Sequence, residues 1–195
     1  MSPRPRKASD DQVFGAMVRV MERVGPAELT LAAIAKEAGL TAGALVQRFG
    51  SKHAMQVAAA RGAAEYAGLF LEGLAARHRS PLAALRDYAE CLAGLAPTPE
   101  RLARNLSYLA NDIADPALRR HLLVQSRATR AGLKALLDSA VSKRELKPRT
   151  DTAAVARIIE TVLGGALITW ATYREGPAKV WLREHLEAVL KAHVV

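Results

Sequence analysis

Apolar residues recur every three or four positions along most of this chain, beginning with a stripe that ends at Gly25-Pro26. The stripe consists of Val13, Phe14, Met17, Val20, Met21 and Val24. This spacing places side chains on one face of a helix. Alternating runs of β-branched and aromatic residues, which are typical of strands, do not occur in the sequence. The pattern predicts an all-α protein with about nine helices.

Capping residues and prolines predict where these helices begin and end. Thr30 and Thr41 each precede a short apolar run, and hydroxyl side chains are good helix N-caps. Ser80-Pro81 and Asp115-Pro116 each combine a capping residue with proline at the first helical position. We expect helices over residues 10–24, 31–38, 42–49, 52–77, 81–96, 99–113, 116–141, 151–174 and 178–193, and a polar loop at 142–149.

The second and third predicted helices are short and meet at a tight turn. Gly39 can adopt the left-handed conformation that ends a helix, and the small Ala35 and Ala38 let two helix backbones approach. Leu40 fills the apolar position of the turn. The side chains expected to pack against the first helix are Ile34, Leu45 and Phe49. Two short helices joined in this way are typical of a helix-turn-helix.

The outward face of the third helix carries side chains suited to DNA. Positions 44, 47 and 48 share one face, which would enter the major groove. The Gln47 amide can donate and accept together, which favours adenine, and Arg48 can reach a phosphate or guanine. Ala44 permits close approach and contact with a thymine methyl group.

Phosphate contacts are expected around this face. Thr30 and Thr41 offer hydroxyl and backbone N–H groups at helix N-termini, and Lys52 lies just past the third helix. Basic residues before the first helix can follow the DNA backbone or enter a minor groove. The complete predicted DNA-binding set is Arg4, Arg6, Lys7, Thr30, Thr41, Ala42, Gly43, Ala44, Val46, Gln47, Arg48 and Lys52.

Net charge supports a polyanionic partner but does not identify it. The formal charge is +9, from 28 basic and 19 acidic residues. This excess suits nucleic acid, and it also suits an anionic membrane surface. A helical protein-interaction or membrane-surface module is therefore the alternative. The most apolar stretch, 162–171, is about half the ~20 residues of a membrane span, so we expect a cytoplasmic protein.

Catalytic and metal-binding patterns are missing from the sequence. The five histidines are scattered without metal-ligand spacing, and Cys91 is the single cysteine. A lone cysteine on a helix is usually a small hydrophobe, although a histidine brought near by folding would make it a nucleophile. We therefore expect no enzyme, no metal site and no cofactor.

Residues Asp10 to Met55 resemble the DNA-binding domain of the TetR family of bacterial regulators. The matching motifs are Leu29-Thr30-Leu31, Ile34-Ala35, Ala38-Gly39-Leu40, Thr41-Ala42-Gly43-Ala44-Leu45 and Phe49-Gly50-Ser51-Lys52. The chain departs from the family at Val46, where a tyrosine that often contacts phosphate is usual, and at Arg48, where histidine or tyrosine is common. Arg48 can replace the lost contact through charge-assisted hydrogen bonds.

The resemblance implies a transcriptional regulator, usually a ligand-released repressor, that binds a palindromic operator as a homodimer. It divides the chain into a flexible basic arm at 1–9, a helix-turn-helix domain at 10–52, and a helical ligand-binding and dimerisation domain at 53–195. A small-molecule inducer would shift the helix at 52–77 and so change the separation of the two recognition helices.

The last two predicted helices are candidates for the dimer contact. Gly164-Gly165 indicates close approach of another backbone. The predicted interface is Ile159, Leu163, Ala166, Leu167, Trp170, Trp181, Leu186 and Val189. Such apolar faces equally suit an internal core, because an amphipathic helix does not distinguish self from partner.

Polar and aromatic residues on otherwise apolar helices are candidates for the inducer pocket. They are Tyr66, Phe70, Tyr88, Cys91, Tyr108, Asn111, His121, Gln125 and Trp170. Each is alternatively an internally hydrogen-bonded core group or a surface group. Few carboxylates lie on the apolar faces, which favours a neutral or apolar ligand.

Overall fold

The computed structural model describes residues 8–195, and in this range the regular structure consists of helices and one isolated bridge between Leu146 and Val194. The predicted all-α class with nine helices is confirmed within the described residues. The helices are α1 (Asp10–Met21), α2 (Leu31–Ala38), α3 (Ala42–Phe49), α4 (Lys52–Arg77), α5 (Pro81–Gly94), α6 (Pro99–Ala114), α7 (Pro116–Ser142), α8 (Thr152–Tyr173) and α9 (Ala178–Leu190).

Side-chain caps start eight of these nine helices. They are Ser9, Thr30, Thr41, Ser51, Ser80, Thr98, Asp115 and Asp151, whereas α9 begins after Pro177 with no side-chain cap. Ser9 had been assigned to the flexible arm, but its hydroxyl accepts a hydrogen bond from the Gln12 backbone N–H (3.2 Å). The Gln12 side chain accepts one from the Ser9 N–H (2.8 Å), which completes a capping box.

Two predicted helices extend three residues beyond the ends that the structure shows. The helix α1 stops at Met21, before Val24, and α9 stops at Leu190 rather than near His193. In the predicted loop after α7, the backbone turns so that Leu146 is fully buried. Glu145 beside it accepts hydrogen bonds from the Ser80 hydroxyl (2.8 Å) and the Leu82 N–H (3.1 Å), so the loop is tied to the start of α5.

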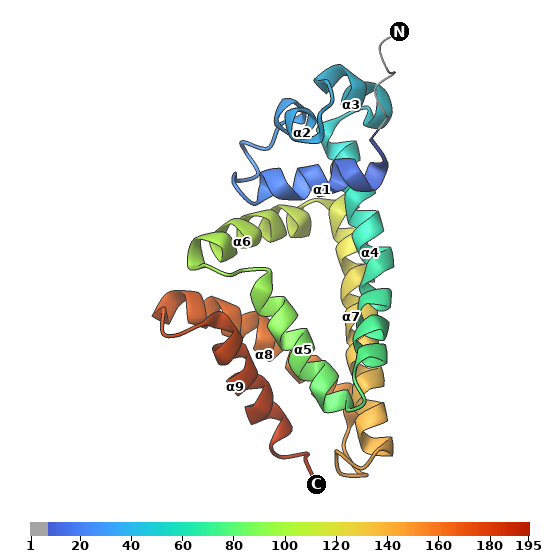
Figure 1. Ribbon diagram of the computed structural model, residues 1–195, viewed down its shortest axis with the longest axis vertical. Coiled ribbons are helices and arrows are strands. Elements are labelled where there is room, and N and C mark those ends of the chain that lie inside the picture. Colours follow the sequence, from blue (N-terminus) through green and yellow to red (C-terminus); the bar gives the residue numbers. More distant parts are fainter. Residues whose placement is uncertain (1–7) are drawn as a thin grey trace.

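The first three helices and the start of α4 enclose one hydrophobic core. Its buried side chains include Val13, Met17, Ile34, Leu45 and Met55. Tyr108 of α6 also belongs to this core, so the N-terminal helices rest directly on the rest of the molecule (Figure 1).

The second core lies among α4 to α9. Figure 1 shows α4 and α7 running side by side in the same direction, away from the end where α1, α2 and α3 gather. At their contact, Gly132 of α7 faces Leu71 of α4 so closely that a side chain at position 132 would overlap it. The predicted boundary between residues 52 and 53 falls inside α4, which contributes to both cores and joins them.

The side chains predicted to form a dimer interface lie in this second core instead. Six are buried within the chain, and the other two, Trp181 and Val189, are partly buried against the same core. The buried six are Ile159, Leu163, Ala166, Leu167, Trp170 and Leu186. The six buried side chains pack against the chain's own helices, as the internal-core alternative describes. Trp181 and Val189 keep part of their surface exposed, and their role in a dimer contact stays a prediction.

Within the described residues, α8 is also the one helix that is long and apolar enough to span a membrane by length and composition, although 39% of its most apolar 18-residue window is buried in the protein. Its apolar character extends beyond the buried side, because Ile158 and Ile168 are nearly half exposed. This outer face of α8 is therefore unusually apolar for a surface.

Replacing Gly132 with alanine is expected to lower the free energy of unfolding by about 1–3 kcal/mol, because overpacking forces neighbouring atoms apart. The added Cβ would lie 2.6 Å from Leu71 Cδ1 and 2.8 Å from Leu71 Cβ. The control is Gly73→Ala in α4, where nothing lies within 4 Å of the added Cβ. That change should instead stabilise by roughly 0.5–1 kcal/mol. Urea denaturation followed by circular dichroism measures both, and equal stability of the two variants would contradict the close contact.

Candidate nucleic-acid interface

The turn between α2 and α3 is built as the sequence predicted. The Thr30 and Thr41 hydroxyls accept hydrogen bonds from the backbone N–H groups three residues later, each at 3.1 Å. Gly39 has φ of 68°, in the left-handed region, and Leu40 N–H donates to the Ala35 carbonyl at 2.8 Å. These bonds satisfy backbone groups at both helix ends and fix the angle between α2 and α3.

Apolar contacts made by the inner face of α3 hold this helix against α1. Leu45 is fully buried, and the Phe49 and Phe14 ring centroids lie 5.7 Å apart. The opposite face of α3 is consequently exposed, including Val46 at 48% and Gln47. Ala44, Gln47 and Arg48 come together as predicted, and they line a hollow of about 510 Å³ with Ala8, Ser9 and Leu40.

Arg48 is engaged within the protein. Its guanidinium donates to the Ala8 carbonyl (2.5 Å), pairs with the Asp10 carboxylate, and lies 5.5 Å from the centre of the Phe49 ring. The side chain therefore ties α3 to the start of α1. For Arg48 to contact DNA, a phosphate or a base must take the place of the Asp10 carboxylate as the partner of the guanidinium. The sequence carries no local signal for this pair, because its members are far apart in the chain.

Other predicted contacts lie around the exposed face of α3. Thr30, Thr41 and Gly43 are exposed, and Ala42 and Lys52 are partly exposed. Lys52 is the first residue of α4, directly after the Ser51 cap. The predicted residues Arg4, Arg6 and Lys7 lie outside the described residues. These DNA-contact roles remain predictions.

Glu37 is a positioning residue that the sequence reasoning missed. Its carboxylate accepts hydrogen bonds from Arg19 (2.7 Å) and Arg23 (2.5 Å) of the segment that begins at α1, and so holds α2 in place. These bonds, that from Arg19 first, lower the pKa of Glu37. A carboxylate 18 residues from Arg19 gives no recognisable spacing in the sequence.

The predicted inducer-pocket residues do not share one cavity. Tyr108 and Gln125 line a cavity of about 190 Å³ between α1, α4, α6 and α7. Trp170 donates its indole N–H to the Gly176 carbonyl (3.0 Å), and Cys91 contacts Asp87 (3.6 Å). Burial, with a smaller contribution from Glu160, raises the pKa of Tyr88 to about 12. The remaining four, which are exposed or partly buried, are Tyr66, Phe70, Asn111 and His121. Of these, Tyr66 and Phe70 lie together on α4, with ring centroids 6.4 Å apart.

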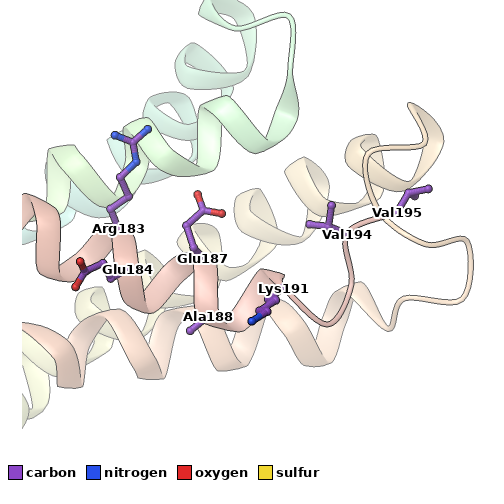
Figure 2. A pocket seen from close by; sticks show the side chains of 7 residues that line it. All are labelled: Arg183, Glu184, Glu187, Ala188, Lys191, Val194 and Val195. Carbon is purple, nitrogen blue, oxygen red and sulfur yellow. The ribbon is translucent and has the colours of Figure 1, made fainter.

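A larger hollow of about 770 Å³ lies on the outer side of α9 and the C-terminal residues (Figure 2). None of the predicted pocket residues lines it. Figure 2 shows charged side chains along it, among them Arg183, Glu187 and Lys191. Glu187 is already bonded to Arg86 of α5, at 2.5 and 3.3 Å. This hollow is a charged surface groove rather than an apolar cavity of the kind that encloses a small molecule.

Comparisons with known proteins agree with this geometry. Residues 15–59 match the family model described as bacterial regulatory proteins, tetR family. A TetR transcription regulator from Haloarcula marismortui is similar in structure, with a TM-score of 0.77 and 18% identity over 95% of this chain and 98% of that one. No curated protein sequence matches the chain.

Two further solved structures share the fold. One is SmeT, the repressor of the Stenotrophomonas maltophilia multidrug efflux pump SmeDEF, with a TM-score of 0.69 and 20% identity over 97% of this chain and 92% of that one. The other is reduced NemR from E. coli, with a TM-score of 0.74 and 16% identity over 95% and 97% of the two chains. At such identities the likeness establishes the fold of the whole chain.

Thr41→Ala is expected to destabilise the protein by about 1 kcal/mol, because the first turn of α3 loses its side-chain cap. The matched control is Ser107→Ala, which removes an exposed hydroxyl bonded to the Ala103 carbonyl within α6. A surface change of that kind should alter stability by less than about 0.5 kcal/mol. Chemical denaturation compares the two, and an equal effect would show that the Thr41 cap contributes nothing specific.

Proposed function

Through its N-terminal domain the chain belongs to the tetR family of bacterial regulatory proteins, and from this membership we propose that it represses transcription as a DNA-binding homodimer released by a small molecule. Regulators of this family bind DNA and small-molecule ligands, act as dimers, are soluble and are generally not enzymes. We accordingly propose a cytoplasmic protein without catalytic activity.

The exposed face of α3 is the observation that carries the DNA-binding proposal. Leu45 and Phe49 anchor the helix, while Gln47 points away from the core on a surface free for a base edge. The N-termini of α2 and α3 are positioned to meet phosphates, because backbone N–H groups and the helix dipole favour anions there. Repression is supported by the likeness to SmeT, which is a repressor.

The outer face of α8, rather than its buried residues, is the surface that supports a homodimer. Ile158, Thr161, Gly165, Ile168 and Thr172 follow one another at intervals of three and four residues and are all exposed. The stripe is uncharged, and the space beside Gly165 is open, which allows a second helix to approach closely. A two-fold axis would place the same stripe of a second copy against it.

A membrane-surface module is the alternative that the sequence left open. The exposed apolar stripe of α8 would suit either a second copy or a lipid surface. The family membership and the exposed α3 face favour the dimer, because both α3 helices are then held at a fixed separation. Binding to anionic vesicles without binding to DNA would reverse this preference.

Gln47→Ala is expected to reduce the preference for a cognate duplex over a scrambled one by roughly 5- to 150-fold, because a bidentate base contact is lost. Lys52→Ala should weaken binding to both duplexes alike and reduce the salt dependence by about one charge. Lys179→Ala, an exposed lysine on α9, is the matched control and should change neither. Fluorescence anisotropy at two salt concentrations, with DNA from upstream of the gene, measures these effects. A Gln47→Ala variant with full sequence preference would contradict the assigned recognition face.

Ile168→Glu is expected to convert the dimer into monomers, because it buries two unpaired carboxylates across the two-fold axis. The control is Leu69→Glu in α4, which places the same charge on a leucine that is 62% exposed and outside the α8 stripe. Light scattering after size-exclusion chromatography gives the mass of each variant. A wild-type monomer, or an Ile168→Glu dimer, would refute this interface.

A further inference from the structure

A cavity lies where the N-terminal helices meet the rest of the chain. Its volume is about 190 Å³, and residues from α1, α4, α6 and α7 line it. Those that matter here are Met17 and Met21 of α1, Ala63 of α4, Tyr108 and Asp112 of α6, and Gln125 of α7. The cavity is smaller than the roughly 300–1,000 Å³ of drug-sized sites, so it suits a compact molecule.

Small and adaptable side chains shape its apolar wall. Ala59, Ala60 and Ala63 leave space along one side of α4, where longer side chains would fill the gap. Met17 and Met21 face them from α1, and methionine adjusts readily to the shape of an apolar ligand.

Asp112 is the charged group that lines this cavity. No ion pair joins Asp112 to a basic side chain of the described residues, whereas Asp115, three residues later, pairs with His53 (2.8 Å) and caps α7. Burial raises the pKa of Asp112; a hydrogen bond with the Asn111 side chain opposes this shift, and the Asp115 charge adds to it. Partial burial disfavours the charged form of a carboxylate that has no cation beside it. A positively charged ligand would offset that desolvation cost.

We propose that this junction cavity binds a small organic cation, with a protonated amine against Asp112 and a compact apolar body between the α1 methionines and the α4 alanines. The sequence favoured a neutral or apolar ligand, since few carboxylates lie on the apolar faces. Asp112 changes that expectation because the fold brings it to the mouth of an apolar space.

Hydrogen bonds and an ion pair near this cavity join α6 to the residues that directly follow α1. The Tyr108 hydroxyl donates to the Val24 carbonyl (3.0 Å), and Arg104 donates to the Glu22 carbonyl (3.0 Å). Arg101 pairs with the Glu22 carboxylate (2.7 Å). A ligand lodged between α1 and α6 would contact Tyr108, and so would act on its bond to Val24 and, through α1, on the orientation of α3. This regulatory step rests on the proposed function; binding in the cavity does not.

Calorimetry with 2-phenylethylamine and its neutral analogue 2-phenylethanol tests the site without DNA. The amine should bind about 10- to 100-fold more tightly, because a hydrogen bond to a charged group adds that much affinity. Asp112→Asn should remove this preference and leave the affinity for the alcohol unchanged. Glu65→Gln, which removes an exposed carboxylate of α4, is the matched control for net charge.

Ala63→Leu provides a second variant, because this residue is exposed at the rim and leucine there fills the cavity without entering the core. It should abolish binding of both compounds while the thermal unfolding temperature is retained. Absence of amine binding at millimolar concentration, equal affinity for amine and alcohol, or equal behaviour of Asp112→Asn and Glu65→Gln would each overturn the proposed site.

DNA anisotropy with the upstream duplex separates this inference from the proposed function. The amine should weaken DNA binding by the wild-type protein and have no effect on Asp112→Asn. If the amine binds and DNA affinity is unchanged, the regulatory step is wrong and the site stands. If no variant binds DNA, the proposed function fails while calorimetry still decides the site.

Discussion

The contact between α4 and α7 is the constraint on which the two-part organisation depends. Met55 at one end of α4 is buried in the N-terminal core, while Leu71 and Leu74 at the other end are buried in the second core. Gly132 allows α7 to approach Leu71 so closely that α4 has little freedom to slide along it. This contact therefore fixes α4 relative to α7, and with it the position of Met55 in the N-terminal core.

Helix positions were predictable because their signals are local. The starts of α2 and α3 follow from the predicted caps Thr30 and Thr41, whose side chains bond backbone groups three residues away, and Ser51 caps α4 in the same way. Burial was less predictable, because it depends on which helices meet. The inner stripe of α8 is apolar and its outer stripe carries no charge, and only the packing of α9 and α7 against α8 shows that Ile159 lies inside while Ile158 lies outside.

The candidate sites were likewise predictable only where one helix sets the geometry, because contacts between helices leave no signal in the sequence. Gln47 lies on the exposed face as its spacing predicted, because one helix sets the relation between positions 44, 47 and 48. Arg48 has the predicted place, but the structure bonds it to Asp10, a partner that no spacing indicates. Tyr108 and Gln125 are recognisable in the sequence as polar groups on apolar helices, whereas Asp112 gains its place beside the cavity only from the neighbouring α1 and α4.

The capping side chains have a consequence for how such a sequence can evolve. Eight helices begin at a Ser, Thr or Asp that bonds its own next turn, so each start is specified by about four residues and not by distant partners. Substitutions can then accumulate at exposed positions without shifting the start of the helix that carries them. Ligand and operator preference can diverge on an unchanged scaffold, which is consistent with a TM-score of 0.77 at only 18% identity.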